Sequence, residues 1–235
     1  MIKTLLKLQT SQLKINYMKN LIIIGANGFA RDIYSLSLSS FGYNTEFLVG
    51  GFIDDNMDSL NKIYNEKDNP LYYYPPVINK ISDYVIKEND VFVCAIGETS
   101  AKKSCIEIIS RKGGKFINLI HKSAHVDNSA KLGFGVIVLN NGFIGAGSLI
   151  GNHVLIQVSS VVGHDCIIGD LCRIDCNAVC VGGIELEDEV VVHTSAIINH
   201  NVKVGKGACI GAGSFAIKTV KANTTVFGSP ARQLT

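Results

Sequence analysis

The sequence of 235 residues has no tryptophan, only four prolines and no apolar run near the roughly 20 residues that span a membrane. Its 22 lysines and arginines nearly balance its 20 aspartates and glutamates, which gives no broad charged surface for nucleic acid or membranes. The seven cysteines are an odd number in a chain long enough to fold without disulfides. This favours reduced thiols and a cytoplasmic protein. Cys172, Cys176 and Cys180 are spaced by four residues, which matches no zinc motif, so no metal site is expected.

The composition, 47% hydrophobic and 18% charged, is typical of a globular protein rather than a disordered chain. Residues 1–17 are mildly apolar and contain lysines, but they lack a compact hydrophobic core and a small-residue cleavage site. A secretory signal is therefore not expected. We interpret residues 1–17 as an extension, and Met18 is an alternative start directly before the first convincing strand.

The second half of the chain carries an unbroken repeat of six residues. From Val126 to Ile210, fifteen successive steps hold a branched aliphatic residue or, once, Cys180. A second, usually small, residue follows each of them after four positions. A fixed period of this kind is the signature of a solenoid. We expect a prism with three flat walls, in which each hexad forms one short strand and one corner, and glycine and asparagine occupy the corners. Fifteen hexads then make about five coils, with no long external loop.

The first half alternates short apolar runs with stretches that resemble helices, which predicts a small Rossmann-like parallel sheet. The expected strands are residues 21–24, 47–53 and 91–96, the expected helices are 31–40 and 100–112, and a last strand follows Gly113-Gly114. The polar, tyrosine-rich segment 56–84 between them is expected to be a long loop.

Glycines or acids follow each expected strand, at the edge where ligands bind in such sheets. The glycine turn lets a phosphate approach the backbone at a helix N-terminus, and carboxylates accept hydrogen bonds from a ribose or a base. The alternative interpretation is a tight turn without a ligand, because Ala30 replaces the third glycine of the dinucleotide fingerprint. The small size of the domain favours a mononucleotide. The candidate residues are Gly25, Asn27, Gly28, Phe29, Asp54, Asp55 and Gly97.

Hexads three apart stack in one column of the prism, and one corner column contains a histidine and an aspartate between small residues. Its members are Asn128-Ser129, Ala146-Gly147, His164-Asp165, Gly182-Gly183 and His200-Asn201. An imidazole titrates near neutral pH, which suits a general base, and a nearby carboxylate can orient it. A solvated corner histidine without a function is the alternative.

The segment Gly163-His164-Asp165-Cys166-Ile167-Ile168-Gly169-Asp170 resembles the active-site motif of the group of sialic-acid O-acetyltransferases and bacillosamine-pathway N-acetyltransferases. Further segments resemble the group in the same order: residues 24–32, 52–55, 95–97, 118–124 and 228–232. Members join a small Rossmann-like domain to a left-handed β-helix of hexapeptide repeats. The resemblance implies a nucleotide-sugar-binding domain at residues 18–118 and a left-handed β-helix acetyltransferase domain at 119–235.

The resemblance also implies roles for individual residues. His164 is implied as the general base and Asp165 as the acid that tunes it. The glycine-turn residues, with Asp54 and Asp55, are implied to hold a nucleotide-sugar. Acetyl-CoA is implied to lie between the prisms of a homotrimer, against Arg173, Gly182, Thr194 and Ala212. Some members have a histidine at the position of Arg173, where it is a contact for the acetyl carbonyl.

The implied activity is N-acetylation, with acetyl-CoA, of a nucleotide-linked 4-amino-4,6-dideoxy sugar for surface glycan biosynthesis. One alternative is O-acetylation of a sialic-acid-type hydroxyl. Another is a metal-dependent β-helix hydratase that resembles the gamma carbonic anhydrases, although His164 and His200 lie two coils, ~9.6 Å, apart by strand spacing. That spacing is too wide for both to bind one ion within a chain. A non-catalytic nucleotide-sugar-binding or assembly module is the third alternative.

Overall fold

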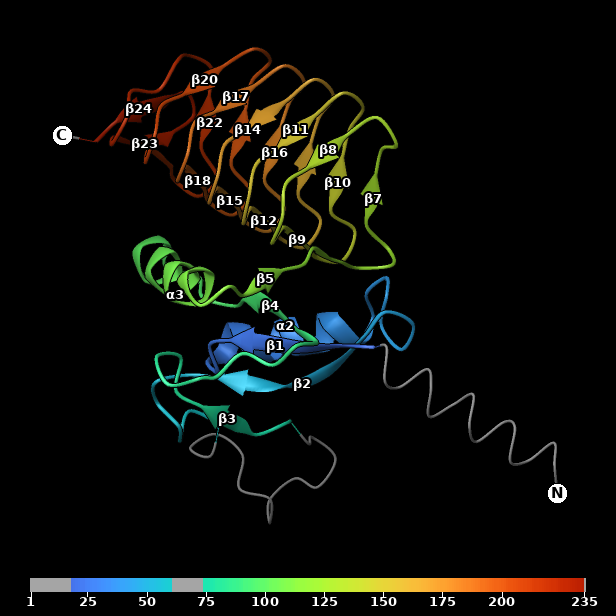
Figure 1. Cartoon of the computed structure of the whole chain (residues 1–235). Coiled ribbons are helices and arrows are strands. Elements are labelled where there is room, and N and C mark those ends of the chain that lie inside the picture. Colours follow the sequence, from blue (N-terminus) through green and yellow to red (C-terminus); the bar gives the residue numbers. More distant parts are fainter. Residues whose placement is uncertain (1–17, 61–73, 235) are drawn as a thin grey trace, which may run out of the picture. The chain divides into compact units, whose positions relative to one another are not determined.

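The computed structural model describes residues 18–60 and 74–234. The predicted extension, residues 1–17, and part of the expected loop, residues 61–73, lie outside the described residues. The chain divides into two compact units, residues 1–116 and 117–235, close to the boundary predicted between residues 118 and 119. Figure 1 shows the first unit as a sheet with helices and the second as a stack of coils.

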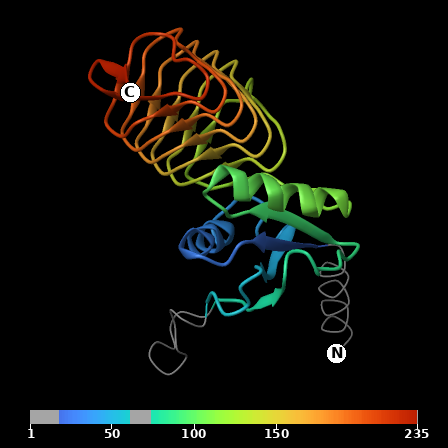
Figure 2. The ribbon, with the colours of Figure 1, turned by 90° about the vertical axis from the view of Figure 1, so that its left-hand side faces the viewer.

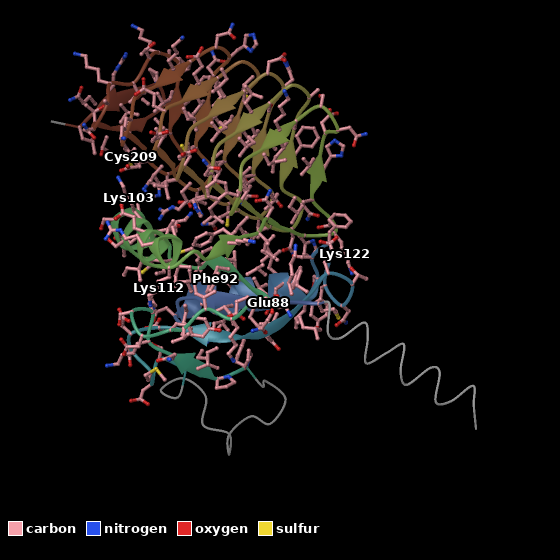
Figure 3. The ribbon with its side chains drawn as sticks, viewed as in Figure 1. Glu88, Phe92, Lys103, Lys112, Lys122 and Cys209 are labelled. Carbon is pink, nitrogen blue, oxygen red and sulfur yellow. The ribbon has the colours of Figure 1, made fainter. Side chains whose placement is uncertain are left out.

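The first unit, called the sheet domain here, contains a five-stranded parallel sheet in the order β3-β2-β1-β4-β5. The central strand β1 ends in four fully buried residues, Leu21 to Ile24, and Phe92 of β4, which is labelled in Figure 3, is also fully buried. Such apolar runs are typical of strands that are covered on both faces. The elements are β1 (Lys19–Ile24), α2 (Gly28–Leu38), β2 (Phe47–Ile53), β3 (Val77–Asn79), β4 (Asp90–Cys94), α3 (Thr99–Arg111) and β5 (Lys115–Phe116).

Two details of the sheet domain differ from the prediction. The segment expected to be a loop, 56–84, contains the edge strand β3, which pairs with β2. Three residues after a proline are too few to show a strand period, so the sequence did not reveal it. The helix α2 begins at Gly28 rather than Arg31, because the glycine-turn residues form its first turn.

The second unit is a parallel β-helix of two-residue strands, with one strand in each hexad. Strands eighteen residues apart pair in parallel, as Ile144 does with Val162, so three hexads make one coil as predicted. The strands are β6 (Leu119–Ile120), β7 (His125–Val126), β8 (Lys131–Leu132), β9 (Ile137–Val138), β10 (Phe143–Ile144), β11 (Leu149–Ile150), β12 (Leu155–Ile156), β13 (Val161–Val162), β14 (Ile167–Ile168), β15 (Arg173–Ile174), β16 (Val179–Cys180), β17 (Glu185–Leu186), β18 (Val191–Val192), β19 (Ile197–Ile198), β20 (Lys203–Val204), β21 (Cys209–Ile210) and β22 (Phe215–Ala216), followed by β23 (Thr225–Gly228) and β24 (Ala231–Gln233).

The strands form three sheets, which are the walls of the prism. Wall 1 contains β7, β10, β13, β16, β19 and β22; wall 2 contains β8, β11, β14, β17 and β20; wall 3 contains β6, β9, β12, β15, β18, β21, β23 and β24. The first corner joins wall 1 to wall 2, the second joins wall 2 to wall 3, and the third joins wall 3 to wall 1. Figure 2 shows the coils stacked along one axis.

The interior of the prism is the predicted aliphatic column. From Val138 to Ile210, every residue of the six-residue series is at most 4% exposed. The small residues four positions later are buried beside them, among them Cys166, Cys172 and Ala178. The helix is longer than predicted, because β6 adds a hexad before Val126 and β22 adds one after Ile210. The continuous register from β6 to β22 confirms that no long loop interrupts the coils in this described stretch.

Candidate active site

The first corner places His164 and Asp165 in the middle of the predicted column. The backbone N–H of Asp165 donates to Ala146 O at 2.8 Å, and that of Gly183 donates to His164 O at 2.8 Å. Asp165 has a positive φ of 55°, and Gly183 in the next coil has a φ of 74°. The same tight corner therefore repeats in successive coils, which are joined by these hydrogen bonds. The side chains of His164 and Asp165 project outwards from it.

His164 and Asp165 form a hydrogen-bonded pair, with 2.8 Å between Nδ1 and Oδ2. Their side chains are 63% and 72% exposed, so a ligand can reach both. When Nδ1–H donates to the carboxylate, the lone pair of the imidazole lies on Nε2. This is the tautomer that a general base requires.

Glycines on both sides leave room for this pair. A Cβ at Gly182 would lie 2.5 Å from Nε2 of His164, and one at Gly147 would lie 2.5 Å from Oδ1 of Asp165. Any other residue at either position would displace the pair. The space that the imidazole and the carboxylate occupy, predicted as an open slot, therefore exists because Gly182 and Gly147 have no side chains.

Across Gly182, the ring of His164 approaches that of His200, with 6.2 Å between the centroids and 53° between the planes. The separation of ~9.6 Å expected from strand spacing describes the backbones and is wrong for the rings. The rings lean together because Gly182 has no side chain to keep them apart. His200 is thus a neighbour of the candidate base, and the glycine between two histidines of one column was the signal for it.

The four residues implied for acetyl-CoA do not come together within one chain. Gly182 lies in the first corner beside His164. Arg173 begins β15 on wall 3, whereas Thr194 and Ala212 follow β18 and β21 in the third corner. The two groups therefore occupy different sides of the same prism.

A polar cluster that the sequence did not reveal surrounds Asp175 where wall 3 meets the third corner. The carboxylate of Asp175 contacts Arg173 Nε at 2.9 Å, His193 Nδ1 at 3.0 Å and Gln157 Nε2 at 2.9 Å. The side chain of Asp175 is only 10% exposed. Gln157, Asp175 and His193 are eighteen residues apart, and this spacing was the available signal.

In the sheet domain, the glycine turn after β1 is held by one of the predicted carboxylates. Gly25 has a φ of 97°, and its N–H donates to Ile53 O at 2.8 Å. Asp54 accepts the N–H of Ala26 at 2.7 Å through Oδ2 and that of Asn56 at 2.8 Å through Oδ1. Asp54 therefore fixes the glycine turn with Oδ2 and its own loop after β2 with Oδ1, a role that the sequence did not indicate.

The other predicted residues of this edge are more accessible. Asn27 and Gly28 are exposed, Phe29 is half-buried, and a Cβ at Gly97 would meet nothing within 4 Å. Asp55 is exposed and accepts the N–H of Ile81 at 3.1 Å. Because β1, β2 and β4 are neighbouring parallel strands, these residues share the carboxyl edge of the sheet.

The two helices of the sheet domain have different N-termini. Asn27, the N-cap of α2, makes no capping bond with its side chain, and the first turn has no acidic residue. At α3, the carboxylate of Glu98 accepts the N–H groups of Ala101 at 2.7 Å and Ser100 at 2.9 Å. These hydrogen bonds lower the pKa of Glu98 below its ordinary value. The N–H groups at the start of α2 are therefore available to an anion, whereas those at the start of α3 already bond to the carboxylate of Glu98.

Within the part of the chain that the structure describes, no three histidine, cysteine or acidic side chains are grouped to hold a metal ion. Cys172 and Cys180 are buried in the prism, and Cys176 is half-buried in the third corner. Burial raises the pKa of the Cys180 thiol. No helix among the described residues is long and apolar enough to cross a membrane.

Residues 20–109 match the family model of the PglD N-terminal domain. The acetyltransferase domain of PglB from Neisseria gonorrhoeae FA1090, in complex with acetyl coenzyme A, aligns with a TM-score of 0.80 and 25% identity, over 92% of this chain and 100% of that one. PerB from Caulobacter crescentus, in complex with CoA and GDP-perosamine, aligns with a TM-score of 0.80 and 23% identity, over 92% and 97%.

Two relatives are similar in sequence over shorter stretches. Serine acetyltransferase of Bacillus pumilus (strain SAFR-032) is 31% identical over 149 residues, which cover 56% of this chain and 69% of that enzyme. A 2,3,4,5-tetrahydropyridine-2,6-dicarboxylate N-acetyltransferase of Staphylococcus aureus (strain bovine RF122 / ET3-1) is 37% identical over 68 residues, 26% of this chain. The chain spans only 28% of the length of that relative.

The fold and the first corner define a two-domain protein with a Rossmann-like sheet followed by a left-handed β-helix, which confirms the predicted fold class. The chain belongs to the hexapeptide-repeat acyltransferases, in the group whose sheet domain is of the PglD N-terminal type.

Proposed function

We propose that the protein is an acetyl-CoA-dependent N-acetyltransferase that acts on the amino group of a nucleotide-linked amino-sugar, of the 4-amino-4,6-dideoxy type, for surface glycan biosynthesis. The observation that carries this proposal is the exposed His164–Asp165 pair in a corner that Gly147 and Gly182 keep open. The likeness to PglB with acetyl coenzyme A and to PerB with CoA and GDP-perosamine supports the donor and the class of acceptor.

In the proposed reaction, the neutral sugar amine attacks the thioester carbonyl carbon of acetyl-CoA. A C–N bond forms, Nε2 of His164 takes the amine proton, and the C–S bond breaks as CoA leaves as the thiolate. Asp165 holds the imidazole in the tautomer that accepts this proton and stabilises the imidazolium. The backbone N–H of Gly182 has no acceptor among the described residues, which supports its proposed role as donor to the oxyanion.

The sheet domain is proposed to bind the nucleotide-sugar. The uncapped N-terminus of α2 offers N–H groups and the positive end of the helix dipole to the phosphates. Asn27, Gly28 and Phe29 would line this phosphate site, together with Gly25, whose turn brings the backbone close, and Gly97 in the loop after the neighbouring strand β4. Asp55 remains the better candidate for the ribose or base, because Asp54 already accepts two backbone N–H groups.

We propose a homotrimer with active sites between subunits. Gly182 and the group formed by Arg173, Thr194 and Ala212 lie on different sides of one prism, so two copies are needed to surround one acetyl-CoA. Large apolar side chains project from walls 1 and 2, with exposures of 39–48% at Phe143, Leu149, Ile167 and Ile197. Such a surface supports burial against another copy. All seven cysteines are free thiols, which supports the proposed cytoplasmic location.

The test is acetyl transfer from acetyl-CoA to a panel of UDP-, dTDP- and GDP-linked amino-sugars, followed by mass spectrometry. We expect a single acetyl group on the nitrogen of at least one nucleotide-sugar. Free sialic acid and nucleotide-sugars without the amine serve as hydroxyl acceptors in the same panel. Acetylation of these alone would establish O-acetylation instead, and the absence of both transfer and acetyl-CoA binding by calorimetry would overturn the proposal.

A further inference from the structure

A second histidine–carboxylate pair lies outside the first corner, at the junction of wall 3 and the third corner. His193 Nδ1 lies 3.0 Å from Oδ2 of Asp175, and the two side chains are 37% and 10% exposed. The first pair, His164 and Asp165, is much more exposed. A carboxylate buried to this degree needs partners for its charge, and Asp175 has three.

The partners of Asp175 occupy both of its oxygens. Oδ1 lies 2.9 Å from Arg173 Nε and accepts Gln157 Nε2 at 2.9 Å. Oδ2 accepts Arg173 Nη2 at 3.2 Å and contacts His193 Nδ1 at 3.0 Å. Because an ionised carboxylate only accepts, Nδ1 of His193 carries the hydrogen and Nε2 carries the lone pair. Nε2 has no partner among the described residues.

The cluster therefore combines a donor and an acceptor on one surface. Arginine has five N–H groups, more than one carboxylate can accept, and its guanidinium is held here in a fixed orientation. His193 offers an acceptor at Nε2 from the next coil, since β15 and β18 are paired strands. Cys209, labelled in Figure 3, lies in β21, the next strand of wall 3, where it is the pairing partner of Val191.

We propose that Asp175 is a positioning residue, and that the Arg173 guanidinium and Nε2 of His193 which it orients bind the amide-containing arm of acetyl-CoA. This inference rests on the proposed function. The arm presents carbonyl oxygens, which accept from Arg173, and amide N–H and hydroxyl groups, which donate to His193. Thr194, implied for the cofactor by family resemblance, directly follows His193. In this arrangement the ion pair with Asp175 holds the Arg173 guanidinium in place for the arm.

Two substitutions of His193 separate this role from a structural one. Asparagine in His193→Asn can still donate to Asp175 from the position of Nδ1, but it removes the acceptor at Nε2. Glutamine in His193→Gln places its oxygen near the position of Nε2 and gives up the bond to Asp175. We expect His193→Asn to raise the KM for acetyl-CoA about tenfold with little change in kcat, and His193→Gln to recover most of this loss. If His193 has only a structural role, His193→Gln should be the more damaging variant, because it loses the bond to Asp175. The property that changes should then be the Tm and not the KM.

Asp175→Asn tests the positioning role directly. An asparagine presents an oxygen to Arg173 but an NH₂ group to His193, which inverts the tautomer and turns Nε2 into a donor. We expect a larger rise in the KM for acetyl-CoA than for His193→Asn. The matched control is Asp188→Asn, which changes a second-corner carboxylate that accepts the N–H of Asp170 at 3.0 Å. Asp188→Asn is expected to leave this KM unchanged.

Calorimetric titration of CoA into the same full-length variants provides a readout that does not depend on turnover. If the wild-type protein transfers acetyl groups and His193→Asn binds CoA normally, the inference is overturned while the proposed function stands. If the wild type binds CoA without transfer, the proposed function fails and the binding data still decide the inference. A wild type that does not bind CoA at all overturns both. If Asp175→Asn does not fold, the His193 pair alone decides.

Discussion

The first corner of the β-helix and the N-terminus of α2 are both bordered by glycine, yet they expose different chemical groups. In the β-helix, most backbone N–H and C=O groups bond to neighbouring coils, as Asp165 N does to Ala146 O. The groups that remain available there are mainly side chains, among them the candidate base His164. At α2, the helix start leaves N–H groups without intrahelical partners, so the backbone itself can bind an anion. One region suits proton transfer and the other suits charge recognition.

The largest expected effect is at His164, the side chain proposed as the proton acceptor. His164→Ala is expected to lower kcat by ~10²–10⁴ with little change in Tm, because the base is lost and the side chain is mostly exposed. Steady-state kinetics and thermal unfolding measure the two quantities. His121→Ala is the control, since His121 follows β6 in the third corner, where its Nδ1 bonds to Ser123. Near-normal turnover of His164→Ala would remove proton transfer from this corner.

The next largest effect is expected when the glycine border of His164 is filled. A Cβ at Gly182 would lie 2.5 Å from Nε2, so Gly182→Ala must displace the imidazole. A shift of about 1 Å in a catalytic group costs on the order of 10²-fold in kcat/KM. In a double-mutant cycle, Gly182→Ala should have little further effect once His164 is alanine. Additive losses would mean that Gly182 acts independently of the histidine.

A smaller effect is expected when α2 is given the type of N-terminus that α3 has. Asn27→Asp keeps the shape of the N-cap and adds a negative charge where the phosphates are proposed to bind. We expect the KM for the nucleotide-sugar to rise about 3- to 10-fold, while the KM for acetyl-CoA stays the same. Unchanged affinity for a nucleoside diphosphate in calorimetry would show that phosphate binds elsewhere.

The smallest effect is expected at Glu98, and it depends on pH. Hydrogen bonds from Ala101 and Ser100 lower the pKa of Glu98, so its contribution to stability is present above the unfolded pKa and is lost as pH falls through the folded pKa. Glu98→Gln should therefore have a lower Tm at neutral pH, and the difference should shrink in acid. The helical circular dichroism signal reports on this unit, because α2 and α3 are the α-helices of the described residues. An equal difference at every pH would exclude the carboxylate charge as the cause.

The β-helix could be predicted from the sequence almost residue by residue, because each hexad repeats the same local environment. The buried series through Ile144, Val162 and Cys180 follows directly from the period. The same register placed His164 and Asp165 in one corner and Gly182 in the next coil. The register also predicts that Gly182 and Arg173 lie on different sides of the prism, because each hexad belongs to one wall.

Other parts of the site depend on interactions that no short period encodes. The pairing of β3 with β2 joins segments more than twenty residues apart. The use of Asp54 to fix the glycine turn depends on where two strands meet. The approach of His200 to His164 depends on the direction in which two rings lean, and the Asp175 cluster depends on side-chain geometry across coils. Sequence patterns indicate which residues are neighbours, but they do not indicate how those side chains bond.

The pairing of strands eighteen residues apart also sets the step in which this chain can change length. Removal or duplication of a whole coil of eighteen residues leaves every later residue on its own wall. Removal of six residues between His164 and Gly182 moves the glycine, and every later corner, one wall around the prism. The buried aliphatic column would survive such a change, because each hexad fills the interior alike. Variants of this chain can therefore gain or lose whole coils without a change of register. A change of one hexad keeps the fold but separates His164 from Gly182.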